Sequence, residues 1–276
     1  MKTLLVPVDF SATSDNAVSF AIEWCKAYGY ERVILLKTFY DSIFENLVIS
    51  AEYVNLNQDY LNAQREQAME QLDSLCKSVA ERVGLGVKVM TAVSEFPLLR
   101  GVFELIRNEK PDLIVLGSDN LNNSGGSSMA GNVISIAKAS PVRVLVVPGH
   151  SQYQPVAKAL LPYNTRMLND LDRLNSFRTA PQWDHLKLLV LNIDTDIARH
   201  KEAADKFEHL LKNFEYELYF TADKNVVDSI TNFTKEHSVQ LIIALPGRHS
   251  FLYRLTHASL SQAIYRNATL PVLILK

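Results

Sequence analysis

Two segments of this chain carry residue types suited to binding a phosphorylated ligand. In the first, the apolar run of residues 4–8 ends on Asp9, whose carboxylate can accept hydrogen bonds from an adenine amino group or a ribose hydroxyl. In the second, residues 117–132 are rich in glycine, serine and asparagine. Glycines let a backbone approach a ligand closely, and a helix expected from about residue 130 points free N–H groups at an anion such as phosphate.

Short apolar runs that alternate with helical patterns must position these two segments. The runs are almost wholly apolar, which indicates buried strands in a parallel sheet covered by helices on both faces. In such sheets ligands bind beyond the carboxyl ends of the strands, where both segments lie. Strands are expected at residues 4–8, 33–36, 87–91, 113–116 and 142–147. Helices are expected from a cap at Ser11, Thr13 or Ser14 to Gly29, over 58–83, from Pro97, and over 130–139.

The chain also repeats itself. Residues 110–117 resemble residues 238–245 at an offset of 128, whereas Pro7 corresponds to Pro162 at an offset of 155. A repeat of this length indicates duplicated domains. Because the offset falls from 155 to 128, the second copy is 27 residues shorter, between its second and third strands. We therefore expect two tandem three-layer α/β/α domains with five-stranded parallel sheets, residues 1–149 and 156–276.

The opening at residues 6–9, the segment 112–118 and the strand at 144–147 resemble the universal stress protein family, and the resemblance extends over both copies. It implies the adenine-nucleotide-hydrolase-like fold, and it implies a tandem member whose two copies pack as an intramolecular pseudo-dimer. The strands at 142–147 and 270–275 would otherwise be exposed apolar edges, and in the family such strands pair across the dimer. Whether two chains then form a homodimer is left open.

ATP-binding members of that family carry a Gly-x2-Gly-x9-Gly-Ser/Thr pattern and an aspartate after the first strand. The resemblance therefore implies that the first copy binds ATP or a related adenine nucleotide, with Mg²⁺ accompanying it. Asp9 and Gly117 match the pattern, but Asn120 stands at the second glycine and the final pair is Ala130-Gly131, or Gly131-Asn132 after a one-residue shift. Substitute phosphate donors are then expected among the serine and asparagine side chains. The implied binding residues are Pro7, Val8, Asp9, Gly117, Ser118, Ser127, Ser128, Gly131 and Asn132.

The second copy has lost both ends of this pattern. Asn164 stands where the first copy has Asp9, and Leu245 and Ser259 stand where it has Gly117 and Gly131. We expect this copy not to bind ATP in the same way.

Several of these residues also have a purely structural interpretation. Asp9 could simply cap the first helix or its turn, and Gly125 and Gly126 could be only a flexible loop. Cys25 falls on the apolar face of a helix, which favours a buried structural thiol over a reactive one. The histidines are too far apart in the sequence to suggest a metal site.

Composition excludes several classes of protein. The chain has 276 residues, 47% of them apolar and 21% charged, and a net charge of −2, which gives no reason to expect nucleic-acid binding. It has two cysteines and no apolar run long enough to span a membrane, which favours a reduced, cytoplasmic protein.

No ordered Ser-His-Asp set, carboxylate pair or metal motif is present. The favoured function is a stress-response binding module that holds an adenine nucleotide and at most hydrolyses it slowly. The alternative is a scaffold or interaction protein in which both sites have decayed.

Overall fold

The structure is a computed structural model whose described residues form two compact units. The first unit contains the described residues up to Ser118 together with 129–142, and the second begins at Arg143. The two units are described separately. The described residues are 1–39, 48–49, 54–55, 58–118, 129–163, 174, 183, 185–192, 207–208, 211, 214–221, 226–245 and 270–276.

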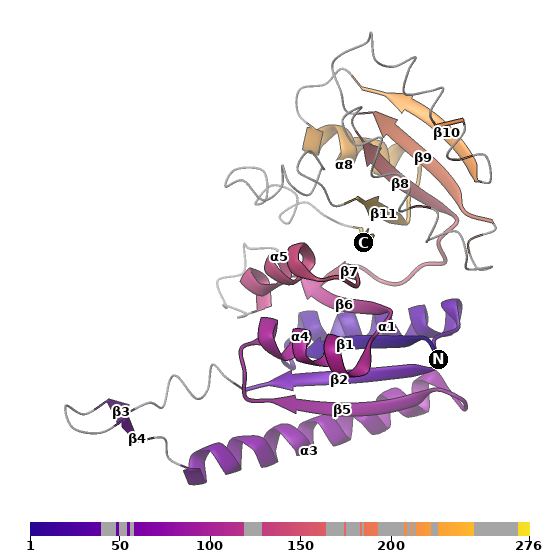
Figure 1. Cartoon of the computed structure of the whole chain (residues 1–276). Coiled ribbons are helices and arrows are strands. Elements are labelled where there is room, and N and C mark those ends of the chain that lie inside the picture. The colour runs from indigo at the N-terminus through magenta and orange to yellow at the C-terminus, as the bar shows by residue number, and fades with distance from the viewer. Residues whose placement is uncertain are drawn as a thin grey trace. The chain divides into compact units, whose positions relative to one another are not determined.

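The first unit is a parallel sheet with helices on both faces (Figure 1). Its strand order is β5-β2-β1-β6, and every pair in it is parallel. Helices α1 and α3 pack against each other, as do α4 and α5. The chain passes from β1 to β2 and β5 in one direction along the sheet, and then returns beyond β1 to form β6. Because such crossovers are right-handed, α1 and α3 cover one face of the sheet and α4 and α5 cover the other. The strands are β1 (Thr3–Val8), β2 (Arg32–Thr38), β5 (Lys88–Ser94) and β6 (Leu113–Ser118); the helices are α1 (Ala12–Tyr28), α3 (Gln58–Val83), α4 (Leu98–Glu109) and α5 (Met129–Ala139); β3 (Val48–Ile49) and β4 (Val54–Asn55) pair as a separate antiparallel ladder.

Local signals in the sequence account for the bounds of these elements. Helix α1 begins after Ser11, whose side chain accepts a hydrogen bond from the Ser14 N–H, and ends at Gly29 in the left-handed conformation (φ 63°). Helix α3 has the predicted bounds and is exposed over most of its surface, while Ala68, Leu72 and Val79 are buried. All six residues of β1 and of β6 are buried, as expected for strands covered on both faces.

The second unit has the strand order β10-β9-β8-β11-β12-β7. All its pairs are parallel except β12 with β7, which is antiparallel and joins Val272 to Val146. The two strands that the sequence marked as apolar edges therefore cover each other. The boundaries at residues 149 and 156 stay a prediction. The elements are β7 (Arg143–Pro148), β8 (Lys158–Tyr163), β9 (Lys187–Asn192), β10 (Glu215–Phe220), α8 (Val226–Glu236), β11 (Leu241–Ala244) and β12 (Val272–Ile274).

The 27-residue difference lies where the sequence places it. Residues 39–87 join β2 to β5, whereas only residues 193–214 join the corresponding strands β9 and β10. The excursion at residues 41–57 lies mostly outside the described residues.

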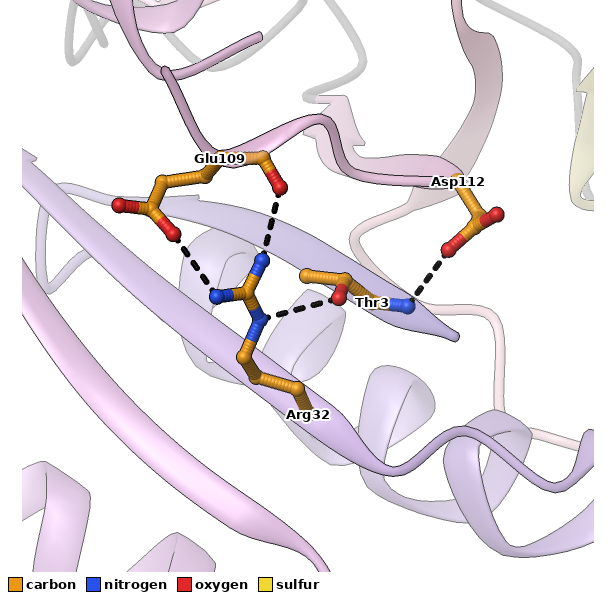
Figure 2. Close-up of polar contacts among 4 residues, drawn as sticks. All are labelled: Thr3, Arg32, Glu109 and Asp112. Atoms are coloured by element: carbon orange, nitrogen blue, oxygen red, sulfur yellow. Dashed lines mark hydrogen bonds and ion pairs between the residues drawn. The ribbon is translucent and has the colours of Figure 1, made fainter. Parts of the chain in front are cut away.

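Similar hydrogen bonds occur in the two units at the amino ends of the strands. The Thr3 N–H donates to Oδ2 of Asp112 at 2.7 Å (Figure 2), and the corresponding Lys158 N–H donates to Oε1 of Gln240 at 2.8 Å. The residues two positions before these acceptors, Lys110 and Ser238, both have positive φ, 48° and 52°. Positions related by the sequence offsets therefore share this geometry although their side chains differ. Among the described residues, no helix is long and apolar enough to cross a membrane.

Candidate functional site

The candidate site lies at the point where the strand order of the first unit reverses. Strand β1 pairs with β2 on one side and β6 on the other, and ligands of such sheets bind at the carboxyl ends of strands flanking a reversal. Asp9 directly follows β1, and Gly117 and Ser118 are the last residues of β6. Pro7 and Val8 are buried within β1, so they can only form the floor of this site.

Asp9 is held by the turn that starts helix α1. Its Oδ1 accepts hydrogen bonds from the Ser11 N–H at 2.9 Å and from the Ser11 hydroxyl at 2.6 Å. Ser11 is itself the N-cap, with its Oγ 3.2 Å from the Ser14 N. The capping role of Asp9 is therefore real, but it uses only one carboxylate oxygen. Among the described residues none donates to Oδ2, which leaves that oxygen as an acceptor in a fixed orientation.

The residue after Asp9 has an unusual backbone. Phe10 has φ 63°, a conformation that residues with a Cβ adopt rarely outside turns. The Lys37 ammonium, at the carboxyl end of β2, lies 3.4 Å from the Asp9 carbonyl oxygen and 5.0 Å from the centre of the Phe10 ring. Sequence reasoning missed both residues. The available signal was a lysine that breaks the apolar run of β2 just where the strand meets the site.

Gly117 has a packing role that the motif did not reveal. A Cβ at this position would lie 2.8 Å from the Thr13 carbonyl oxygen and 2.9 Å from Thr13 Cγ2. Contacts this short are not tolerated, and the backbone oxygen cannot move without helix α1. The glycine is therefore required for packing of α1 on β6, whether or not a ligand also approaches it.

The amino end of helix α5 is the predicted phosphate end of the site. Gly131 and Asn132 lie in its first turn rather than in the preceding loop, because the helix begins at Met129. The backbone N–H of Gly131 is among the first four of the helix, which have no carbonyl partner within it and favour an anion. Ser127 and Ser128 lie outside the described residues.

The corresponding end of β8 in the second unit is filled by aromatic side chains. Tyr163, the counterpart of Val8, is completely buried and meets the ring of Phe207 edge-on at 4.3 Å between centroids. Leu245, which stands at the position of Gly117, is also buried. Asn164 and Ser259 lie outside the described residues. A base or sugar would have to displace this apolar packing.

Nothing in the described part of the chain suggests metal or thiol chemistry. No group of three His, Cys, Asp or Glu residues there could hold a metal ion. Cys25 is buried, its Sγ lies 3.4 Å from the Tyr30 carbonyl oxygen, and burial raises its pKa to about 11. The thiol therefore stays protonated and unreactive at neutral pH, as the helical pattern predicted.

The first unit is therefore an open α/β fold with polar residues at the carboxyl ends of β1 and β6. The chain belongs to the universal stress protein family, whose family model matches residues 1–148. The predicted family and α/β fold are thus confirmed. A comparison with curated proteins gives no match.

Solved structures share the fold over nearly the whole chain. A universal stress protein from Archaeoglobus fulgidus DSM 4304 is 16% identical with a TM-score of 0.65, covering 99% of this chain and 98% of that one. The cytoplasmic domain of a prokaryotic cation chloride cotransporter is 17% identical with a TM-score of 0.54, covering 99% and 94%. The protein PA1789 from Pseudomonas aeruginosa PAO1 is 13% identical with a TM-score of 0.54, covering 100% and 92%. At these identities the likeness concerns the fold alone.

Proposed function

We propose that the first unit binds ATP or a related adenine nucleotide and that the chain acts as a tandem, cytoplasmic stress-response binding module. The observation that carries this proposal is the Asp9 carboxylate at the strand reversal. One oxygen is fixed by Ser11, and no described residue donates to the other. Asp9 Oδ2 would accept a hydrogen bond from the base amino group or a ribose hydroxyl.

The phosphates would lie at the amino end of α5. The N–H group of Gly131 would donate to them, assisted by the Asn132 side chain and the hydroxyls of Ser118, Ser127 and Ser128, and Mg²⁺ would accompany the nucleotide. The second unit would serve as a scaffold, because Tyr163 and Phe207 close its equivalent position. We expect any hydrolysis to be slow, because the sequence contains no ordered Ser-His-Asp set, carboxylate pair or metal motif.

One observation favours the alternative, a scaffold that binds no nucleotide. Two of the motif residues are explained by packing alone, since Gly117 makes room for Thr13 and Asp9 supports the cap at Ser11. A protein that had lost its ligand would still need both residues to fold.

Thermal unfolding with ATP, ADP, AMP and cyclic AMP, each at millimolar concentration with and without Mg²⁺, separates the two functions. A nucleotide at a hundred times its Kd stabilises the folded state by roughly 2.7 kcal/mol, which raises Tm by several degrees. No shift with any of the four nucleotides favours the scaffold.

Two matched variants then distinguish ligand binding from capping. Asp9→Asn keeps an oxygen that can accept from Ser11 but replaces the second acceptor by an amino group, so it should leave the unliganded Tm almost unchanged and remove the nucleotide shift. Ser11→Ala should lower the unliganded Tm, because losing an N-cap costs about 1 kcal/mol, while retaining a nucleotide shift. A lower unliganded Tm for Asp9→Asn together with an unchanged nucleotide shift would show that Asp9 serves the fold alone.

A further inference from the structure

Backbone strain identifies a feature of the site that the family motif does not contain. Among the described residues, three that are not glycine have positive φ. Lys110 and Ser238 are related by the offset of 128 and lie one and two residues after helices α4 and α8, where the left-handed conformation ends a helix. Phe10 follows a strand instead. Such a conformation persists only where the surroundings hold it, and it concentrates at functional sites.

Two sets of contacts hold the turn at Phe10. Toward the helix, Ser11 donates twice to the Asp9 side chain. Toward the sheet, the Lys37 ammonium lies 3.4 Å from the carbonyl oxygen of Asp9 and 5.0 Å from the Phe10 ring centre. Strand pairing brings the lysine there, because Lys37 is the register partner of Val8, the residue before Asp9. The carboxylate is thus fixed through its side chain by one residue and through its backbone by the other.

The two copies of the repeat differ at both charged positions together. At the offset of 155, Asp9 corresponds to Asn164 and Lys37 to Asn192. Asn192 is completely buried, and it is the register partner of the buried Tyr163, as Lys37 is of Val8. The first copy thus has both Asp9 and Lys37. The second copy, in which Tyr163 and Phe207 fill the end of β8, has asparagine at both positions. This joint replacement indicates that Lys37 and Asp9 act as one unit.

We propose that Lys37 is a positioning residue of the nucleotide site. By holding the Asp9 carbonyl and the Phe10 ring, it keeps Asp9 Oδ2 oriented toward the N–H or O–H donor of the nucleotide. This inference rests on the proposed nucleotide function. It assigns to Lys37 no contact with the ligand itself.

The test measures ATP binding to the full chain by calorimetry for Lys37→Met, Lys37→Arg and a control, Lys77→Met, which removes an exposed lysine of α3. Loss of the hydrogen bond to the Asp9 carbonyl and of the cation–π contact with Phe10 should weaken ATP binding about tenfold in Lys37→Met. Lys37→Arg retains a cation and a donor and should recover most of this loss, while Lys77→Met should bind as the wild type does.

A second measurement does not depend on the ligand. Amide hydrogen exchange at Ser11, whose N–H is bonded to Asp9 Oδ1, should become several times faster in Lys37→Met than in Lys77→Met. If the wild-type chain binds none of ATP, ADP, AMP and cyclic AMP, the proposed function fails, and unchanged exchange at Ser11 would overturn the inference separately. If the wild type binds ATP and Lys37→Met binds it equally well, the inference alone is wrong.

Discussion

The substitution Gly117→Ala tests whether the first motif glycine serves packing or the ligand. The added Cβ would lie 2.8 Å from the Thr13 carbonyl oxygen, 2.9 Å from Thr13 Cγ2 and 3.2 Å from Thr13 C. Two of these three atoms belong to the backbone at the start of α1, so no rotation of a side chain relieves the clash. The first turn of α1 must therefore move away from β6.

The expected magnitude follows from this geometry. Forcing extra volume into a well-packed position costs about 1–3 kcal/mol. For a folding unit of this size each kcal/mol lowers Tm by roughly 2–4 °C, so the unliganded variant should unfold several degrees below the wild type. Circular dichroism melting without nucleotide measures this directly.

Gly101→Ala is the matched control. Its Cβ would lie 3.1 Å from Ser94 Oγ and 3.2 Å from Ser94 Cβ, both side-chain atoms, and alanine is favoured over glycine inside a helix by about 1 kcal/mol. This variant should melt near the wild type or above it. In Gly117→Ala combined with Thr13→Ala, only the contact with Cγ2 is removed, so stability should return in part. An unliganded Tm equal to that of the wild type for Gly117→Ala would refute the packing argument.

Two further predictions concern a buried thiol and a partly buried ion pair. Because burial raises the pKa of the Cys25 thiol to about 11 from 9.0, the folded state keeps a proton that the unfolded state releases above pH 9, so stability should fall from pH 9 upward. Urea unfolding of wild type and Cys25→Ala at pH 8 and pH 10 checks this, and the same pH dependence in both proteins would contradict it. Arg32→Met should lose about 1–3 kcal/mol, because the half-buried guanidinium donates to Thr3 Oγ1 at 3.0 Å and to Glu109 Oε2 and O at 2.8 and 2.7 Å (Figure 2). Lys187, at the corresponding position of the second unit, forms a more exposed ion pair, so Lys187→Met should lose less unfolding free energy in the same urea assay. Equal losses in the two variants would show that burial of the Arg32 ion pair adds nothing to stability.

The order of elements and the family could be predicted from the sequence because those signals are local. Apolar runs predicted strands β1, β2, β5, β6 and β7 to within a few residues, and the bounds of α3 are as expected. Gly29 ended α1 as its backbone freedom suggests. The shorter connection in the second copy could be read from two alignment offsets. Even the pairing of β7 with β12 was implied by two apolar strands that needed cover.

The roles of the site residues depend on contacts between distant segments. Asp9 and Gly117 stand in a motif, but only packing of α1 against β6 shows that Gly117 makes room for Thr13. Likewise, only the pairing of β1 with β2 brings Lys37 to the carbonyl of Asp9, 28 residues away in the chain. A sequence states which residues are present at a strand end. Which of them meet is decided by strand register and helix packing, because parallel strands bring together segments that local patterns treat as independent.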